Sequence, residues 1–195
     1  MAQRRPGHAA YPLVVLIRRE AAADHDTIRA LHRAAFTHGA TDDGRPASDG
    51  LLEATLVDEL RADGDLVPEL TLVAVDAQGE VVGHVAMSAA TLDGRTGEVV
   101  ALGPIGVKPD LQRDGIGSAL MHATVAAADA MGLRGIVLLG HADYYPRFGF
   151  ESAVDHHVTP PQDWGRDNFL LRRLDAWVGC PGGAFRYAPA FDRLS

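Results

Sequence analysis

A strand, a glycine-bearing loop and a helix follow one another at the centre of this chain. Residues 99–107 are apolar and rich in β-branched side chains, which favours a buried strand. Residues 118–131 are rich in alanine and stop at Gly132, as a helix does. The loop between them, QRDGIG at residues 112–117, has two glycines that let a backbone approach an anion closely. Free N–H groups and the helix dipole attract negative charge there, so the sequence predicts a phosphate-binding turn in an α/β fold. A plain strand-to-helix turn is the alternative.

Two common phosphate-binding loops do not fit residues 112–117. The dinucleotide fingerprint needs a third glycine, but Gly117 is followed by Ser118, Ala119 and Leu120. A nucleotide triphosphate loop needs a Lys-Ser or Lys-Thr pair after its glycines, and this loop has neither. The loop resembles instead the (Gln/Arg)-x-x-Gly-x-(Gly/Ala) signature of the GNAT acetyltransferase superfamily, which binds the pyrophosphate of coenzyme A.

A second motif follows the next predicted strand, residues 135–139. Tyr145 precedes Gly149 and Phe150 at the end of a short predicted helix, and this resembles the Tyr-x-x-x-Gly-Phe motif of the same superfamily. The closer resemblance is to the YhbS-like branch of predicted N-acetyltransferases. That branch shares three runs with this chain: LGPIGV from residue 102, YYPRFGF from residue 144 and YAPAF from residue 187.

The resemblance implies an α/β (α+β) fold with a GNAT-type mixed, mostly antiparallel sheet of six to seven strands, a splayed central pair and about four helices. The residue pattern predicts the same order of elements. A flexible tail is expected at residues 1–11 and a single domain at residues 12–195. Strands are expected at residues 13–19, 70–75, 81–89, 99–107, 135–139, 169–174 and 184–187, and longer helices at residues 25–36, 51–62 and 118–131.

The composition restricts the partners of this chain. Its 18 basic and 26 acidic residues give a formal net charge of −8, which argues against a general nucleic-acid binder. A single cysteine, Cys180, excludes an internal disulfide, and no histidine pair has the spacing of zinc ligands. The apolar run at residues 13–17 is too short for a signal sequence, and no run is long enough to span a membrane. We therefore expect a soluble, cytoplasmic protein without a metal, a nucleic-acid partner or a membrane partner.

The resemblance implies acetyl-CoA as the co-substrate. Backbone groups of Ile105 and Val107 would pair with the pantetheine arm, and N–H groups of residues 113–118 would bind the pyrophosphate, with Arg113 and Lys108 near phosphate charge. Asp114 departs from the residue common at its position and is expected to point outward. The predicted cofactor-binding residues are Ile105, Gly106, Val107, Gln112, Arg113, Asp114, Gly115, Ile116, Gly117, Ser118 and Tyr145.

Direct attack of an amine on a thioester needs a base for the amine and an acid for the departing thiolate. Tyr145 is the predicted acid, because a phenol can donate to sulfur; packing in the core is its alternative role. Glu98 lies too far upstream to be matched to the base of other family members. Glu53 and His84 are the candidate bases, with a solvated helix face and a half-buried strand histidine as the alternatives. An amine that arrives neutral would need no base.

The predicted function is transfer of an acetyl group from acetyl-CoA to a primary amine of a small molecule or a protein. A non-catalytic acyl-CoA-binding or regulatory module on the same fold is the main alternative. A toxin-like enzyme that acetylates aminoacyl-tRNA is another, against which the acidic balance weighs. Cys180 has no histidine near it in sequence, which argues against an acyl-carrying thiol. The acceptor would be framed by residues 39–50, the helix 51–62 and residues 160–191, and a homodimer is left open.

Overall fold

The computed structural model describes residues 14–37, 49–140 and 143–194. The predicted tail at residues 1–11 and most of the predicted loop at residues 39–50 lie outside these ranges. Three α-helices are described: α1 (His25–Thr37), α2 (Leu51–Asp63) and α3 (Ile116–Ala130). The strands are β1 (Leu16–Arg19), β2 (Leu72–Val75), β3 (Val81–Leu92), β4 (Arg95–Val107), β5 (Gly135–Leu139), β6 (Glu151–Ser152), β7 (Val158–Thr159), β8 (Phe169–Arg173) and β9 (Gly183–Tyr187).

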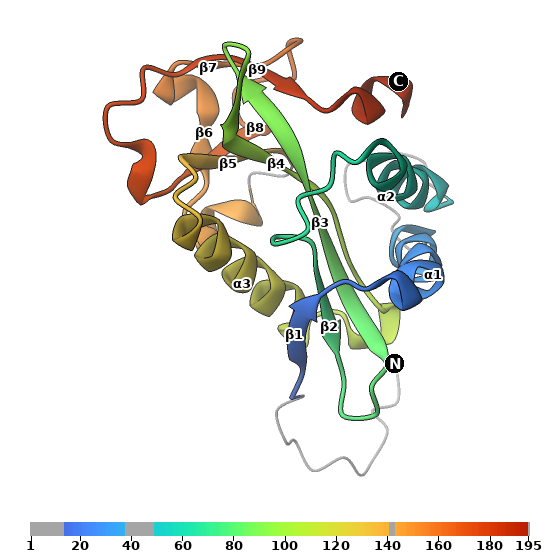
Figure 1. Cartoon of the computed structure of the whole chain (residues 1–195). Coiled ribbons are helices and arrows are strands. Elements are labelled where there is room, and N and C mark those ends of the chain that lie inside the picture. Colours follow the sequence, from blue (N-terminus) through green and yellow to red (C-terminus); the bar gives the residue numbers. More distant parts are fainter. Residues whose placement is uncertain (1–13, 38–48, 141–142, 195) are drawn as a thin grey trace, which may run out of the picture.

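The strands form one mixed, mostly antiparallel sheet in the order β1-β2-β3-β4-β5-β8-β6 (Figure 1). The pair β4–β5 is parallel, and α3 makes the crossover between these two strands. Strand β9 pairs with the far end of β3 and with β7. The predicted fold is thus confirmed, with nine strands rather than six to seven. Around Tyr145 the described chain forms the short 3-10 helix Tyr145–Phe148 in place of an α-helix.

Helices cover both faces of the sheet. Helix α3 lies on one face, and α1 and α2 lie side by side on the other (Figure 1). On the α3 face, Leu120 and Met121 pack against strand residues such as Val85 and Ile136. The opposite face holds a smaller core, whose members are Ile28, Leu31, Val57, Val73, Val75, Val81 and Ala86. Because β3 and β4 are covered on both faces, their central residues are nearly all buried.

Several element boundaries differ from those predicted, and the β3–β4 hairpin and the start of α3 differ for local reasons. Strands β3 and β4 run on to Leu92 and Arg95, because Asp93 and Gly94 both take positive φ angles (49° and 73°) and close a two-residue hairpin. Helix α3 begins at Ile116, two residues earlier than predicted. Gly117 therefore belongs to the first turn of this helix.

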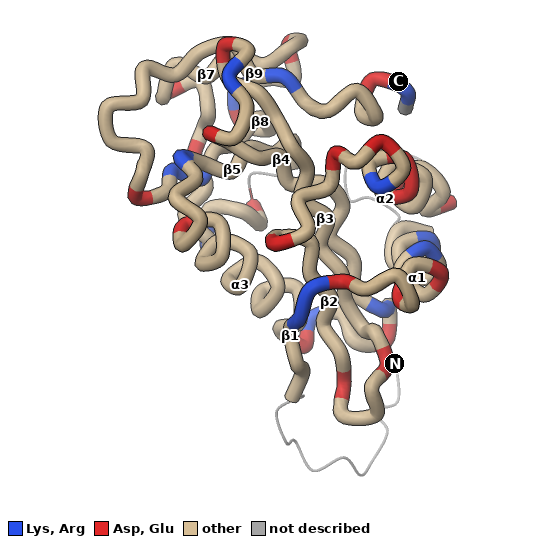
Figure 2. Tube along the Cα trace, viewed as in Figure 1, with Lys and Arg blue, Asp and Glu red and all other residues tan. Residues whose placement is uncertain are grey.

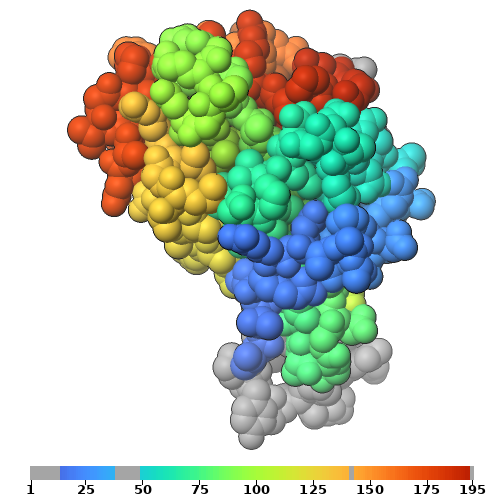
Figure 3. Space-filling model, viewed as in Figure 1, coloured from blue at the N-terminus to red at the C-terminus, as the bar shows by residue number. Residues whose placement is uncertain are grey.

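The C-terminal segment packs against α2. Ala188 and Ala190 are buried with Leu56 and Leu60 of that helix. Arg193 adds ion pairs with Glu59 and Asp63, at 2.8 and 2.5 Å. Figure 3 shows this segment (red) and α2 (teal) as neighbouring parts of one surface. In the view of Figure 2, α1 and α2 carry both acidic and basic residues, and the basic ones do not form a single stripe there. No helix in the described ranges is long and apolar enough to cross a membrane.

Candidate functional site

Strands β4 and β5 separate at the centre of the sheet. They pair only where Val99–Ala101 runs beside Gly135–Val137, whereas β4 continues along β3 to Val107. A β-bulge marks the separation: Met87 lies opposite Leu102 and Val85 opposite Ile105, so β4 has one extra residue here. That stretch includes Pro104, which has no N–H to offer a neighbouring strand. The splayed pair expected from the family resemblance is therefore present.

Beyond the bulge, backbone groups of β4 face the gap. The N–H of Lys108 donates to the carbonyl of Val82 on β3, at 3.0 Å. Since backbone groups of a strand point alternately to its two neighbours, the groups of Ile105 and Val107 point away from β3. The carbonyl of Val107 accepts a hydrogen bond from the side-chain Nε2 of Gln112, at 3.2 Å. Gln112 thus ties the glycine loop to the strand.

A cavity of about 600 Å³ occupies this gap and brings the two sequence motifs together. Its volume falls within the range typical of small-molecule and cofactor sites. Strand β4, the glycine loop, the start of α3 and the segment around Tyr145 all contribute to its wall. The lining residues are Ile105, Val107, Leu111, Gln112, Arg113, Gly115, Gly117, Ser118, Tyr144, Tyr145 and Arg147.

The loop end of the cavity suits an anion. Gly115 precedes α3 with φ at 87°, and no side chain caps this helix N-terminus. The first N–H groups of α3 are therefore available to a ligand, and no acidic residue stands in the first turn. A Cβ atom on Gly117 would lie 3.3 Å from the hydroxyl of Tyr144, so a glycine keeps this wall open. Asp114 is exposed, as predicted, and is not part of the cavity wall.

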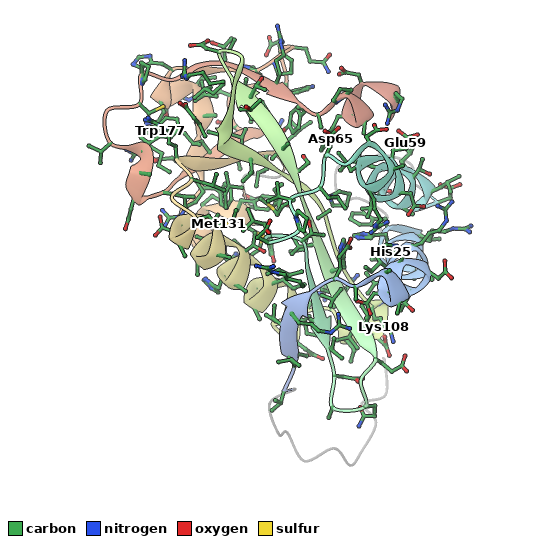
Figure 4. The ribbon with its side chains drawn as sticks, in the orientation of Figure 1. His25, Glu59, Asp65, Lys108, Met131 and Trp177 are labelled. Atoms are coloured by element: carbon green, nitrogen blue, oxygen red, sulfur yellow. The ribbon has the colours of Figure 1, made fainter. Side chains whose placement is uncertain are left out.

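The basic residues beside the cavity are not those predicted, apart from Arg113. Arg147 lines the cavity, and its guanidinium lies 4.8 Å from the centre of the Tyr144 ring. No role was predicted for Arg147, although it stands within the second motif. Lys108 follows the end of β4 (Figure 4) and does not line the cavity, whereas Arg113 does. The positive charge beside the cavity thus comes from two arginines, which suit phosphate geometry.

Tyr145, the tyrosine of the second motif, lines the cavity. It follows Tyr144 in the cavity wall, and the two rings meet edge to face with centres 5.2 Å apart. Gly140 gives the ring its room, because a Cβ there would lie 2.5 Å from Tyr145 Cε2. Burial, with a smaller effect of Tyr144, raises the pKa of Tyr145 to about 12. The phenol is therefore fully protonated at neutral pH and can act as a donor.

The candidate bases lie outside the cavity wall. Glu53 is half-buried on α2, on the face of the sheet opposite α3. His84 is completely buried on β3, where Gly106 lies opposite it on β4. The ring of His84 is bonded on both sides: its Nε2 lies 3.1 Å from Glu20 Oε2 and its Nδ1 lies 2.8 Å from His32 Nε2. Neither His32 nor Glu20 was among the predicted site residues.

The pKa values of His32, Glu20 and His84 are all lowered from their usual range. Burial, helped by His84 and Arg61, lowers the pKa of His32 to about 3. Burial alone would raise the pKa of Glu20, but hydrogen bonds from His84 and Arg61 outweigh it and lower that pKa to about 2. For His84 the pKa is also lowered, mainly by burial and against the effect of Glu20. The two histidines are therefore neutral and Glu20 is charged at pH 7.

These shifts predict a loss of stability in acid. Below about pH 6.5 the unfolded chain protonates His32 and the folded chain does not, so the free energy of unfolding falls toward pH 3. Glu20 adds to the loss from about pH 4.5 toward pH 2, because its folded pKa is the lower one. Each group contributes a slope of at most about 1.4 kcal/mol per pH unit. Urea unfolding at pH 7, 6 and 5 measures this slope, which should be shallower in His32→Gln; equal slopes would contradict the prediction.

Tyr187 on β9 is half-buried and does not line the cavity. The hydroxyl of Tyr187 has no hydrogen-bond partner among the described residues. Burial raises its pKa, with a smaller effect of Tyr145. Its ring packs against Phe185 and Phe191, with centres 4.8 and 4.5 Å away. Cys180 packs beside the same cluster and does not line the cavity. No group of histidine, cysteine, aspartate or glutamate in the described ranges could hold a metal ion.

Several known proteins are similar to this chain in sequence and in fold. Residues 68–152 match the family model of the acetyltransferase (GNAT) domain. Over 182 residues the chain is 33% identical to the uncharacterized N-acetyltransferase YhbS of Escherichia coli K12, covering 92% of this chain and 100% of the relative. The crystal structure of E. coli YhbS in complex with CoA matches with a TM-score of 0.81 and 32% identity, covering 97% of this chain and 98% of that one. A GNAT family acetyltransferase of Brucella melitensis in complex with acetyl-CoA has a TM-score of 0.71 and 32% identity, covering 92% and 99%.

Proposed function

This chain belongs to the GNAT family of N-acetyltransferases, and from that premise we propose that it transfers the acetyl group of acetyl-CoA to a primary amine by direct attack. The observation that carries the proposal is the convergence of both motifs on one cavity at the splay of β4 and β5. Two relatives at 32% identity were solved with CoA and with acetyl-CoA, which supports the same donor here. The acceptor is a small-molecule or protein amine.

The residues of the cavity fit coenzyme A. Uncapped N–H groups at the start of α3, with Arg113 and Arg147 beside them, would hold the pyrophosphate. Backbone groups of Ile105 and Val107, which face away from β3, would pair with the amide groups of the pantetheine arm. Gln112 would support the binding of coenzyme A indirectly, because its side chain donates a hydrogen bond to the carbonyl of Val107 and so holds the loop against β4.

Tyr145 would act at the sulfur. The amine nitrogen attacks the carbonyl carbon of the thioester, the carbon–sulfur bond breaks, and CoA leaves as a thiolate that needs a proton. The phenol of Tyr145 is protonated at neutral pH because burial raises its pKa to about 12, and it would donate a hydrogen bond to the leaving sulfur. We propose this role for Tyr145, and retain Glu53 as a candidate base on α2.

One observation favours the non-catalytic alternative. The wall of the cavity includes no carboxylate and no histidine among the described residues, so no base touches this space directly. A module that binds an acyl-CoA without turnover on the same fold would have this arrangement. The two proposals differ in whether a thioester is consumed.

Thioester consumption tests the proposed function. Acetyl-CoA binding is measured by calorimetry, and release of free thiol is then followed across a panel of small amines and lysine peptides. We expect binding together with amine-dependent thiol release. Binding without release for every amine would favour the module, and absence of binding would overturn both.

We also propose that residues 12–195 act as one catalytic domain in the cytoplasm.

A further inference from the structure

Tyr144 reaches from the anion-binding end of the cavity to Tyr145. It lines the cavity, and its ring meets the Tyr145 ring edge to face with centres 5.2 Å apart. Its hydroxyl lies at the start of α3, where a Cβ atom on Gly117 would be 3.3 Å from it. This one side chain therefore contacts both the proposed acid and the place where the pyrophosphate of coenzyme A would bind.

Further contacts restrict the ring of Tyr144. The buried Phe148 meets it edge to face, with ring centres 5.3 Å apart. The guanidinium of Arg147 lies 4.8 Å from the ring centre, where a cation is attracted to the aromatic face. Arg147 is itself held, because its Nη2 donates to the carbonyl of Asp143 at 3.3 Å. A contact made at the hydroxyl therefore affects the whole side chain, including the edge that packs on Tyr145.

The hydroxyl of Tyr144 is available to a ligand. It has no hydrogen bond to another described residue, and its oxygen is not among the buried polar atoms of the described chain that lack a partner. Beside it, the N–H groups of Ile116, Gly117 and Ser118 are the first donors of α3, and no side chain caps them. A phenol and these N–H groups can donate to the same anion. No carboxylate among the described residues of the cavity wall competes for them.

Two other neighbours of Tyr145 belong to the sheet side of the motif. A Cβ atom on Gly140, after β5, would lie 2.5 Å from Tyr145 Cε2, and the ring of Phe150 has its centre 5.7 Å from that of Tyr145. Neither Gly140 nor Phe150 lines the cavity. Among these three neighbours, Tyr144 is thus the one that can respond when an anion binds at the start of α3.

We propose that Tyr144 is a positioning residue, which links the binding of the pyrophosphate to the orientation of the Tyr145 phenol. This rests on the proposed function. When the α3 N–H groups and the Tyr144 hydroxyl donate to the pyrophosphate, the Tyr144 ring is fixed and holds Tyr145 toward the leaving sulfur. Binding energy from a remote part of the substrate is then used at the reacting atoms.

A donor supplied in two pieces separates positioning from simple binding. S-acetylpantetheine carries the thioester of acetyl-CoA without the nucleotide, and inorganic pyrophosphate is added as a separate molecule. The activation ratio is the rate of S-acetylpantetheine consumption at saturating pyrophosphate divided by the rate without it. With an amine that the wild type acetylates, we expect an activation ratio of about 10, because small errors in orientation are costly in rate.

Tyr144→Phe removes the hydroxyl and keeps the ring that packs on Tyr145. We expect its activation ratio to fall below about 2, even at pyrophosphate concentrations that saturate this variant. Calorimetry with pyrophosphate alone gives a readout without turnover, and the affinity should be about tenfold weaker because a hydrogen bond to a charged group is lost. The matched control is Tyr187→Phe, which removes a hydroxyl outside the cavity wall. It should keep both the activation ratio and the pyrophosphate affinity of the wild type.

Two results would overturn the positioning role and leave the proposed function standing. One is an equal activation ratio in the wild type and in Tyr144→Phe. The other is a wild type that consumes acetyl-CoA but shows no activation at pyrophosphate concentrations that displace acetyl-CoA from it. A wild type that binds acetyl-CoA and consumes it with no amine would overturn the proposed function, and the positioning role with it.

Discussion

Tyr145→Phe is expected to lower kcat by at least about 100-fold, while the dissociation constant of acetyl-CoA changes little. The substitution removes only the hydroxyl, and a proton donor at the leaving group typically contributes 10²–10⁴-fold. Because burial raises the pKa of this phenol to about 12, it remains a donor throughout the neutral and weakly basic range. The loss should therefore be equally large at pH 7 and pH 9.

Single-turnover rates measure the loss in the chemical step, and calorimetry separately measures the dissociation constant of acetyl-CoA. Tyr144→Phe is the matched comparison, because it removes a hydroxyl from the same cavity. Its hydroxyl stands over Gly117 at the loop end, so we expect a change in the affinity for acetyl-CoA and a smaller change in kcat. A Tyr145→Phe protein with the kcat of the wild type would show that this phenol only packs.

Gly117→Asp is expected to weaken acetyl-CoA binding by at least about 100-fold. The new side chain would enter the first turn of α3, where a Cβ already lies 3.3 Å from the Tyr144 hydroxyl. Its carboxylate would face the bound pyrophosphate, and like charges about 4 Å apart near a protein surface repel by about 4 kcal/mol. The substitution would thus reduce both the space for the pyrophosphate and the positive electrostatic potential at the start of α3.

Calorimetry with acetyl-CoA checks this result, and thermal unfolding checks that the variant is folded. Ala126→Asp on the exposed side of the same helix is the control, because it adds the same charge away from the loop. It should leave the dissociation constant unchanged. A Gly117→Asp protein that binds acetyl-CoA as tightly as the wild type would mean that the pyrophosphate lies elsewhere.

Local patterns predicted most of the fold. Strand β5 has the predicted bounds, and the alternation of strands with α3 predicted the parallel crossover. The extra strands β6 and β7 are two residues long, which is too short for a periodic signal. The start of α3 was predicted two residues late, because a glycine is a poor helix former and Gly117 is part of the glycine-loop motif.

The candidate site was predicted in part. Both motifs and the backbone of β4 meet at one cavity, which is the arrangement that the family resemblance implies. Arg147 was missed because a basic residue in a short turn gives no sign of the direction of its side chain. His32 was missed because it follows Ile28 and Leu31 on the buried stripe of α1, where a histidine looks like an ordinary core residue.

By itself the sequence determined the acetyl-CoA side of the candidate site. That side consists of a strand, a glycine loop at the start of a helix and a tyrosine motif, and each is formed by residues that are adjacent in the chain. Only the tertiary structure decided which polar side chains meet behind β4. His32 lies 52 residues from His84 in the chain, and His84 lies 64 residues from Glu20. Their contacts depend on how α1 packs across the sheet. A backbone turn is specified by neighbouring residues, whereas a buried hydrogen-bonded chain exists only once distant elements have packed together.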